Sequence, residues 1–139
     1  MENKFHCQIC EREIKAKKGL ISHHGYTRPG GGYQTGSCGG ARNLPYEISR
    51  DAIPKEILRI SNFIEHRNKL LEKVKAGVVP IFDTVLGKEI EPTHPSYSNR
   101  KYTYESNLNF YIKQAEREVS RLQKRYDNWK EGDHYDNIN

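Results

Sequence analysis

All three cysteines of the chain lie within its first 38 residues. Cys7 and Cys10 are separated by two residues, and Cys38 follows a glycine-rich stretch. Disulfide pairing would leave one of the three thiols over, so this clustering favours a metal site. A Cys-x2-Cys turn directs backbone N–H groups at both sulfurs, which stabilises the thiolates that zinc requires. A redox pair would usually open a helix, whereas residues 13–15 and 20–22, which follow this pair, are predicted to form a β-hairpin.

A tetrahedral site needs a fourth ligand, and two adjacent histidines lie at a suitable spacing. We favour His24, because Gly25 lets the backbone bend away from the metal. Side chains alternate along a strand, so His23 would then point to the opposite face. His23 in the ligand position is the alternative, and His6 is the next candidate. The predicted ligands of one structural zinc ion are Cys7, Cys10, His24 and Cys38. Three thiolates with one imidazole leave no open coordination position.

The glycines near Cys38 have a structural explanation in this scheme. Residues 30–32 are all glycine, which lets the chain turn tightly and return Cys38 to the metal. Gly39 and Gly40 follow the thiolate and let backbone N–H groups approach the sulfur. A phosphate-binding loop would need a strand followed by GxxxxGK[ST], and the sequence has no such run.

Positive charge is concentrated in the same part of the chain. Residues 1–50 contain eight Lys/Arg and four Glu, a net charge of +4, against +5 for the whole chain. Nucleic acid is the expected partner of such a segment, and a solvated basic surface is the alternative. No base-reading helix follows the cysteines at the spacing of a CCHH zinc finger, so we expect contacts to the nucleic-acid backbone or shape. The expected contact residues are Lys17, Lys18, His23, Tyr26, Arg28, Tyr33 and Arg42.

Two long amphipathic patterns follow residue 50. Seam positions recur in steps of four and three along each pattern, which predicts helices over about residues 53–76 and 106–130. Asp51 is a candidate N-cap of the first helix, and Gly77 closes it. The two seams are equally long, so the helices are expected to pack as an antiparallel hairpin. The seam positions are Ile53, Ile57, Ile60, Ile64, Arg67, Leu71 and Val74 in the first helix, and Leu108, Ile112, Ala115, Val119, Leu122, Tyr126 and Trp129 in the second.

Residues 78–105 connect the two helices and are too many for a simple loop. The run VVPIFDTVLGKEIEP reads as two short strands around Gly87-Lys88. A glycine in the first place of a two-residue turn fits a type II′ hairpin. The following run, THPSYSNRKYTYES, mixes tyrosines with Arg100 and Lys101. We interpret it as a surface loop held by its tyrosines; stacking of these rings on bases is the alternative.

These elements together predict an α+β fold that is mainly α. Residues 1–50 would form a small zinc-binding module of treble-clef or ribbon-like type, and residues 51–139 an antiparallel helical hairpin with a β-hairpin connector. Apolar residues off the seams, such as Phe63 and Phe110, leave a surface that the module or a second copy of the chain could cover, so a homodimer through the helices is an option. No apolar run reaches the roughly 18 residues of a membrane span, and the N-terminus lacks the pattern of a signal peptide. We therefore expect a cytoplasmic protein without a membrane partner.

Two runs of the N-terminal block are specific enough to suggest a family. They are HGYTRPGGG, at residues 24–32 ahead of Cys38, and ARNLPYE, at residues 41–47. With these runs the block resembles a group of small zinc-finger-like proteins, mostly of phage and mobile-element origin, that share HGYxRPGxGxxxxxC and ARxLPYE. The resemblance is specific over residues 7–51, and beyond them only the paired helices correspond. It implies bound zinc and a viral or horizontally transferred origin, and the host-cell cytoplasm as the compartment if the chain is phage-encoded.

Three functions can be weighed against these features. A zinc-stabilised nucleic-acid-binding protein without catalytic activity fits best. The alternative is a protein-interaction module that binds and modulates a host enzyme or defence complex. The third is a metal-dependent nuclease of the ββα type, which needs a histidine or asparagine about eight or nine residues after its asparagine. The residues at those places after Asn43 are Asp51 and Ala52, which cannot complete such a site. We recognise no serine, cysteine or carboxylate triad in the sequence either, so we do not expect an enzyme.

Overall fold

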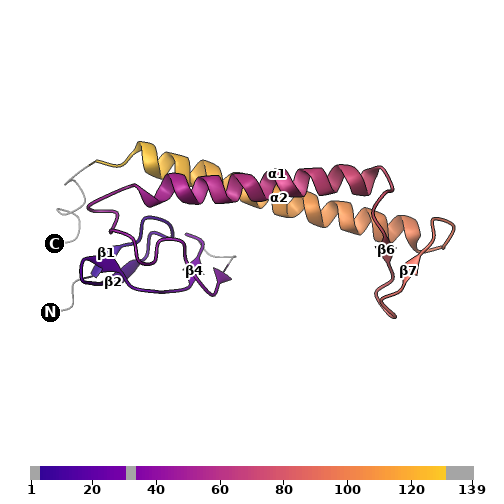
Figure 1. The fold of residues 1–139 in the computed structure, drawn as a ribbon, viewed down its shortest axis with the longest axis horizontal. Helices are drawn as coiled ribbons and strands as arrows, with labels where there is room; N and C mark the ends of the chain where they lie inside the picture. The colour runs from indigo at the N-terminus through magenta and orange to yellow at the C-terminus, as the bar shows by residue number, and fades with distance from the viewer. Residues whose placement is uncertain (1–3, 31–33, 131–139) are drawn as a thin grey trace. The chain divides into compact units, whose positions relative to one another are not determined.

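Short antiparallel strands precede and connect two long helices in the computed structural model, which describes residues 4–30 and 34–130. The helices are α1 (Ala52–Lys75) and α2 (Tyr97–Asp127). The strands are β1 (Lys4–His6), β2 (Glu13–Lys17), β3 (Leu20–Ile21), β4 (Tyr26–Thr27), β5 (Gln34–Thr35), β6 (Ile81–Phe82) and β7 (Glu89–Ile90). The fold is α+β and mainly α, as predicted (Figure 1).

The chain divides into two compact units, and each unit contains part of both helices. The first unit comprises Met1–Arg59 and Ser120–Asn139, and the second comprises Ile60–Val119. This division cuts across the one predicted at residue 50, because the first turns of α1 and the last turns of α2 belong with the N-terminal strands. Residues from both ends of the sequence therefore build the first unit.

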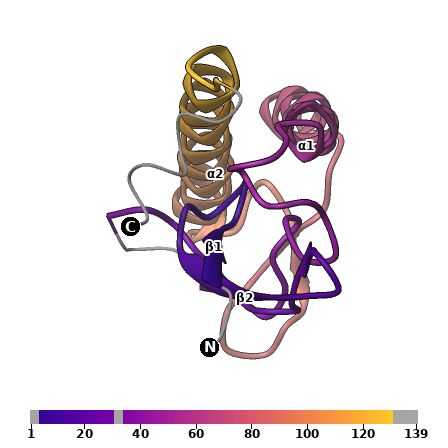
Figure 2. The same ribbon diagram turned by 90° about the vertical axis from the view of Figure 1, so that its left-hand side faces the viewer.

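The first unit contains a three-stranded antiparallel sheet in the order β1-β2-β3; Figure 2 shows its strands β1 and β2. In this sheet Lys4 lies directly opposite Lys15. Strands β2 and β3 form the predicted hairpin, and Lys18 and Gly19 are its two-residue turn. Both residues have positive φ angles, 55° and 81°, as a type I′ turn requires. This turn type matches the twist of the flanking strands, which explains why so short a hairpin forms.

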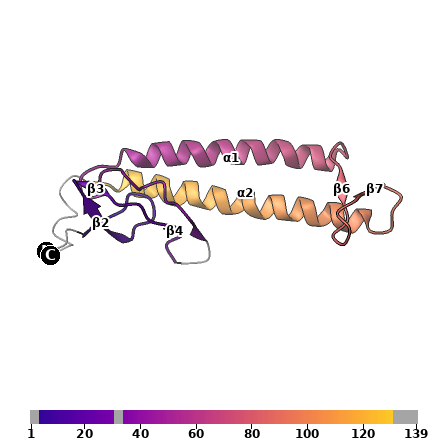
Figure 3. The ribbon, with the colours of Figure 1, turned by 60° about the horizontal axis from the view of Figure 1, so that its bottom comes forward.

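The two helices run side by side in opposite directions (Figure 3) and pack through the predicted seams, except that Trp129 follows the end of α2 at Asp127. In the first unit, Ile53 of α1 and Leu122 of α2 are completely buried. The core of the second unit consists of Leu71, Val74, Leu108 and Ile112, with Ile64, Leu70, Val79 and Tyr104 packed against it. Neither of the described helices combines the length and the apolarity needed to cross a membrane.

Helix α2 begins at Tyr97, well before the predicted start at residue 106. The segment that we interpreted as a tyrosine-held loop, residues 93–106, therefore forms the first turns of the helix from Tyr97 onward. Tyr104 packs against the core of the second unit, and Lys101 Nζ donates a hydrogen bond to the carbonyl oxygen of the last residue of α1 (3.2 Å). The steps of four and three in fact continue backwards from Leu108 through Tyr104 and Lys101 to Tyr97.

The connector contains the predicted β-hairpin, but its turn is wider than the two residues predicted. Strands β6 and β7 pair in antiparallel fashion, and Asp83 N–H donates to the Lys88 carbonyl oxygen (2.9 Å). Within the loop, Leu86 N–H donates to Asp83 Oδ1 (2.7 Å), and Gly87 has a φ of 64°. The aspartate side chain thus closes a longer loop in place of a type II′ turn.

Candidate metal centre

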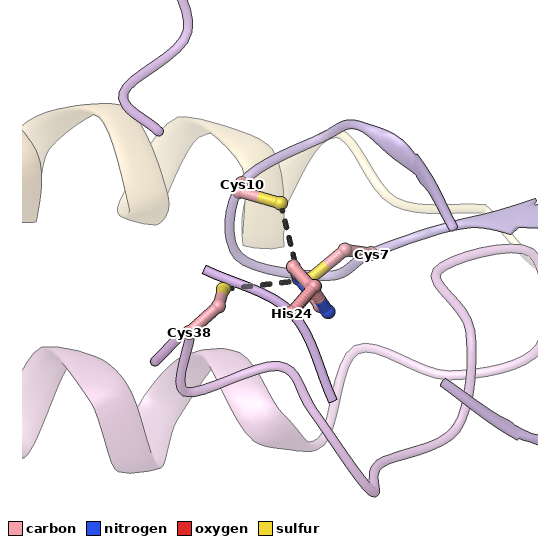
Figure 4. Close-up of side chains that lie close together, drawn as sticks. All are labelled: Cys7, Cys10, His24 and Cys38. Atoms are coloured by element: carbon pink, nitrogen blue, oxygen red, sulfur yellow. Dashed lines mark hydrogen bonds between the residues drawn. The ribbon is translucent and has the colours of Figure 1, made fainter. Parts of the chain in front are cut away.

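Four side chains of the first unit converge on one point, as Figure 4 shows. Their ligand atoms, three Sγ and one imidazole nitrogen, all lie within 4.8 Å of one another. Cys10 Sγ is 3.4 Å from His24 Nε2, and Cys7 Sγ is 3.8 Å from Cys38 Sγ. All three cysteines are buried. These are the four residues predicted from the sequence, and they lie close enough to hold a metal ion.

The Cys-x2-Cys turn (residues 7–10) joins β1 to β2. Cys7 N–H donates to the Arg12 carbonyl oxygen (3.0 Å), which closes the turn. Ile9 N–H donates to Cys7 Sγ (3.4 Å). Glu11, which follows Cys10, has a φ of 65° in the left-handed region. The turn thus aims a backbone N–H at a sulfur, as the Cys-x2-Cys spacing predicts.

The three thiols influence one another's protonation. Hydrogen bonds from Cys38 and Cys7 lower the pKa of Cys10 below its ordinary value. The pKa of Cys7 and the pKa of Cys38 are raised, chiefly by their hydrogen bonds with Cys10. One thiolate is therefore stabilised by two thiol donors. Because the thiolate is the form that binds metal, loading an ion must release the remaining protons, and metal affinity should increase with pH.

One hydrogen bond orients the His24 ring toward the thiols, and another holds the His24 backbone next to Cys38. Its Nδ1 lies 2.7 Å from the Ser22 carbonyl oxygen and donates to it, which leaves Nε2 with the lone pair that a metal needs. The His24 carbonyl oxygen accepts a hydrogen bond from Cys38 N–H (2.9 Å), which joins the last two candidate ligands. The neighbouring His23 is exposed, and its Nε2 lies 3.2 Å from Ser37 Oγ. His24, and not His23, therefore belongs to the cluster.

Gly40 packs directly against the centre. A β-carbon at this position would lie 2.1 Å from Cys7 Sγ, so the sulfur would have to move. A β-carbon at Gly39 would instead meet the carboxylate of Glu56, which is the end of a flexible side chain. Gly40 thus approaches a sulfur closely, as predicted, but this sulfur is that of Cys7 and not of Cys38, and Gly39 faces Glu56 instead of a sulfur.

His6, the second-choice histidine, contacts a buried carboxylate instead of the centre. Glu47 is completely buried, and its Oε1 lies 2.6 Å from His6 Nδ1 and 2.8 Å from His6 N. Tyr46 N–H donates to the His6 carbonyl oxygen (2.8 Å). Hydrogen bonds of Tyr46 and Glu47 with His6 therefore hold the run ARNLPYE against β1.

Gln8, inside the Cys-x2-Cys turn, links the centre to α1. It is completely buried, and its Oε1 accepts a hydrogen bond from Ala52 N–H (2.8 Å), the first residue of the helix. Its Nε2 donates to the Leu44 carbonyl oxygen (2.8 Å) and to Asp51 Oδ1 (3.1 Å). Asp51, the predicted N-cap, accepts hydrogen bonds from the side chains of Ser49 and Gln8, which lower its pKa. The helix is thus capped by Gln8, which sequence reasoning did not single out.

Two arginines of α2 donate hydrogen bonds to the same turn. Arg121 Nη2 donates to the Ile9 carbonyl oxygen (2.8 Å). Arg125 donates from Nε to the Gln8 carbonyl oxygen (2.7 Å) and from Nη2 to that of Cys7 (2.9 Å). Burial lowers the pKa of Arg125 from its ordinary value. The partners lie 112 to 118 residues apart in the sequence, and no local spacing pattern could have revealed them.

The predicted nucleic-acid contacts fall into three groups. Exposed side chains are found at Lys17, Lys18, His23 and Arg42, and Arg28 is half-buried. Tyr26 is buried, and its hydroxyl lies 3.4 Å from Arg121 Nη2. Its ring packs inside the first unit, which corrects the prediction that Tyr26 is displayed to nucleic acid. Tyr33 lies outside the described residues.

Comparisons of the chain with protein-family models, with curated proteins and with solved structures give no match. Function has therefore to be inferred from the metal centre and from the surface around it.

Proposed function

We propose that the centre binds one structural zinc ion. Thiolates and imidazole are the ligands that zinc prefers, whereas hard cations such as magnesium and calcium prefer oxygen. Four protein donors complete a tetrahedral shell, and the three cysteines among them are buried. Such a closed set leaves no position for a substrate, which favours a structural over a catalytic ion.

We further propose that the zinc-bound first unit binds nucleic acid through the outer face of its β1-β2-β3 sheet. The observation that supports this most is a like-charge pair across two strands. Lys4 and Lys15 stand directly opposite each other, and both are exposed. Two ammonium groups on neighbouring strands can neutralise phosphates of a polyanion that lies across those strands.

Other basic residues border this pair. Lys17 shares the exposed side of β2 with Lys15, because side chains alternate along a strand. Lys18 lies in the adjoining turn, and Arg42 lies beside β3, since its N–H donates to the Ile21 carbonyl oxygen (2.7 Å). We call the surface formed by Lys4, Lys15 and Lys17 the basic face; Glu13 lies on the same exposed side of β2. Its contacts would go to phosphates, which position a protein without reading sequence.

A matched pair of triple variants tests the nucleic-acid proposal. Lys4, Lys15 and Lys17 are changed to Gln in one variant, and Lys55, Lys113 and Lys124 in the other, so that both lose the same charge. Binding to labelled DNA and RNA strands is measured between about 50 and 200 mM salt. The basic-face variant should bind more weakly, and its log–log salt slope should be smaller by about 0.7 for each single-strand phosphate, or about 0.9 for each duplex phosphate, that its side chains no longer neutralise. An equal weakening in both variants, or wild-type binding that salt does not weaken, would contradict the proposal.

A protein-interaction module is the second candidate, and the loop of the β6–β7 hairpin favours it. Val85 and Leu86 are 89% and 68% exposed there, and apolar side chains at a loop tip are suited to insertion into an apolar groove of a partner protein. Val85→Ser with Leu86→Ser separates the candidates. Loss of a host partner with nucleic-acid affinity unchanged would favour this second function.

A further inference from the structure

The carbonyl groups of the Cys-x2-Cys turn face two guanidinium groups. Three successive carbonyl oxygens, those of residues 7, 8 and 9, accept hydrogen bonds of 2.7 to 2.9 Å from Arg121 or Arg125. A peptide unit carries its C=O and N–H on opposite sides. Carbonyls drawn toward the arginines therefore leave the N–H groups free to turn toward sulfur, as Ile9 N–H does toward Cys7 Sγ (3.4 Å).

Further contacts hold the two arginines at the turn. Arg121 Nη1 donates to Glu11 Oε2 (2.8 Å), and Arg125 Nη1 lies 3.4 Å from Glu11 Oε1. The Arg125 guanidinium also lies over the Tyr46 ring, 3.5 Å from its centroid, and the Tyr46 hydroxyl donates to the Arg125 carbonyl oxygen (2.6 Å). The side chains of Arg121 and Arg125 are only 20% and 13% exposed. A cation buried to this extent needs all of its acceptors in place, so the arginines and the turn order one another.

We propose that Arg121 and Arg125 are positioning residues of the metal centre, and that metal binding and docking of the last turns of α2 onto the Cys-x2-Cys turn form one coupled equilibrium. The inference rests on the proposed zinc site and extends it from the first 38 residues to the far end of the sequence. Coupling between two equilibria is reciprocal. If docking of the helix end raises the affinity for the ion, bound ion favours the docked helix end by the same free energy. Zinc binding would thus control whether the last turns of α2 dock onto the Cys-x2-Cys turn.

The first arm of the test measures zinc affinity of the full-length chain by competition with a chromophoric chelator. Arg121→Met and Arg125→Met keep most of the side-chain volume and remove the donors, whereas Arg117→Met makes the same change at an exposed position of the same helix. We expect about 10- to 100-fold weaker zinc binding in the first two variants and a change within about twofold in the third. Arg125→Lys retains the charge but not the forked donors, and should fall between wild type and Arg125→Met.

The second arm follows amide hydrogen exchange with zinc bound and after its removal by a chelator. Residues 120–129 should lose protection on zinc removal, and Arg125→Met should lower their protection even with saturating zinc. Wild-type zinc affinity in all arginine variants, or protection of residues 120–129 that zinc does not change, would overturn the inference. An Arg125→Met chain that does not fold with excess zinc is replaced by Arg121→Met and Arg125→Lys, and wild-type affinity in both would equally overturn it. A wild-type chain that binds no zinc would instead refute the proposed zinc site.

Discussion

Gly40 is the residue at which the smallest chemical change should disturb the metal centre most. A β-carbon there would lie 2.1 Å from Cys7 Sγ, so Gly40→Ala must displace either the sulfur or the backbone behind it. We expect zinc affinity to fall by about tenfold or more, since shifts around a metal ligand typically have effects of this size. Competition with a chelator measures it.

Gly36→Ala is the control for this substitution. No atom lies within 4 Å of a β-carbon placed at Gly36, and its distance in sequence from Cys38 equals that of Gly40. Zinc affinity of Gly36→Ala should therefore remain close to that of the wild type. An equal effect of both substitutions would mean that loss of glycine flexibility, and not contact with the sulfur, limits the centre.

At the scale of the element, α1 depends on a residue of the Cys-x2-Cys turn, because Gln8 caps the helix through Ala52 N–H. Gln8→Ala removes this acceptor from a completely buried position. We expect a loss of about 1–2 kcal/mol in the free energy of unfolding. Gln123→Ala, at an exposed position of α2, should change it by less than about 0.5 kcal/mol. Urea denaturation of zinc-saturated protein gives both values, and equal stability of the two variants would contradict the capping role.

Substitutions of two neighbouring tyrosines test whether the first turns of α2 are packed as a helix. Tyr104 packs against the core of the second unit, whereas Tyr102 is 71% exposed. Tyr104→Ala should cost about 1–3 kcal/mol, and Tyr102→Ala less than about 0.5 kcal/mol. If thermal denaturation found the two substitutions equally harmless, residues 97–105 would not be packed as a helix.

Elements were predicted correctly where a local pattern determines them. The two seams follow from helical periodicity, and the four candidate ligands follow from the few residue types and spacings that zinc accepts. The start of α2 was missed because its seam positions carry Tyr97, Lys101 and Tyr104, whose polar ends made a surface loop the simpler interpretation. Tyr26 was assigned to the surface because its neighbour Arg28 suggested a nucleic-acid contact, and sequence alone does not reveal which ring is buried.

On the scale of the whole molecule, the last turns of α2 contact the N-terminal segment of the chain. Arg121 and Arg125 reach residues more than a hundred positions earlier in the sequence, and such contacts leave no periodic trace in one sequence. The candidate metal centre is therefore not supported by the N-terminal segment alone, because its turn makes hydrogen bonds to α1 through Gln8 and to α2 through the two arginines. Zinc removal should therefore loosen the ends of both helices.

The zinc content of the full-length chain and of two histidine variants tests the central claim most directly. Wild type and His23→Ala should each carry about one zinc ion per chain, and His24→Ala should lose it, because His24 Nε2 faces the thiols whereas His23 Nε2 lies beside Ser37 Oγ. Cys38→Ser should lose it as well. Full zinc content in His24→Ala, or a wild-type chain that retains no zinc, would contradict the account.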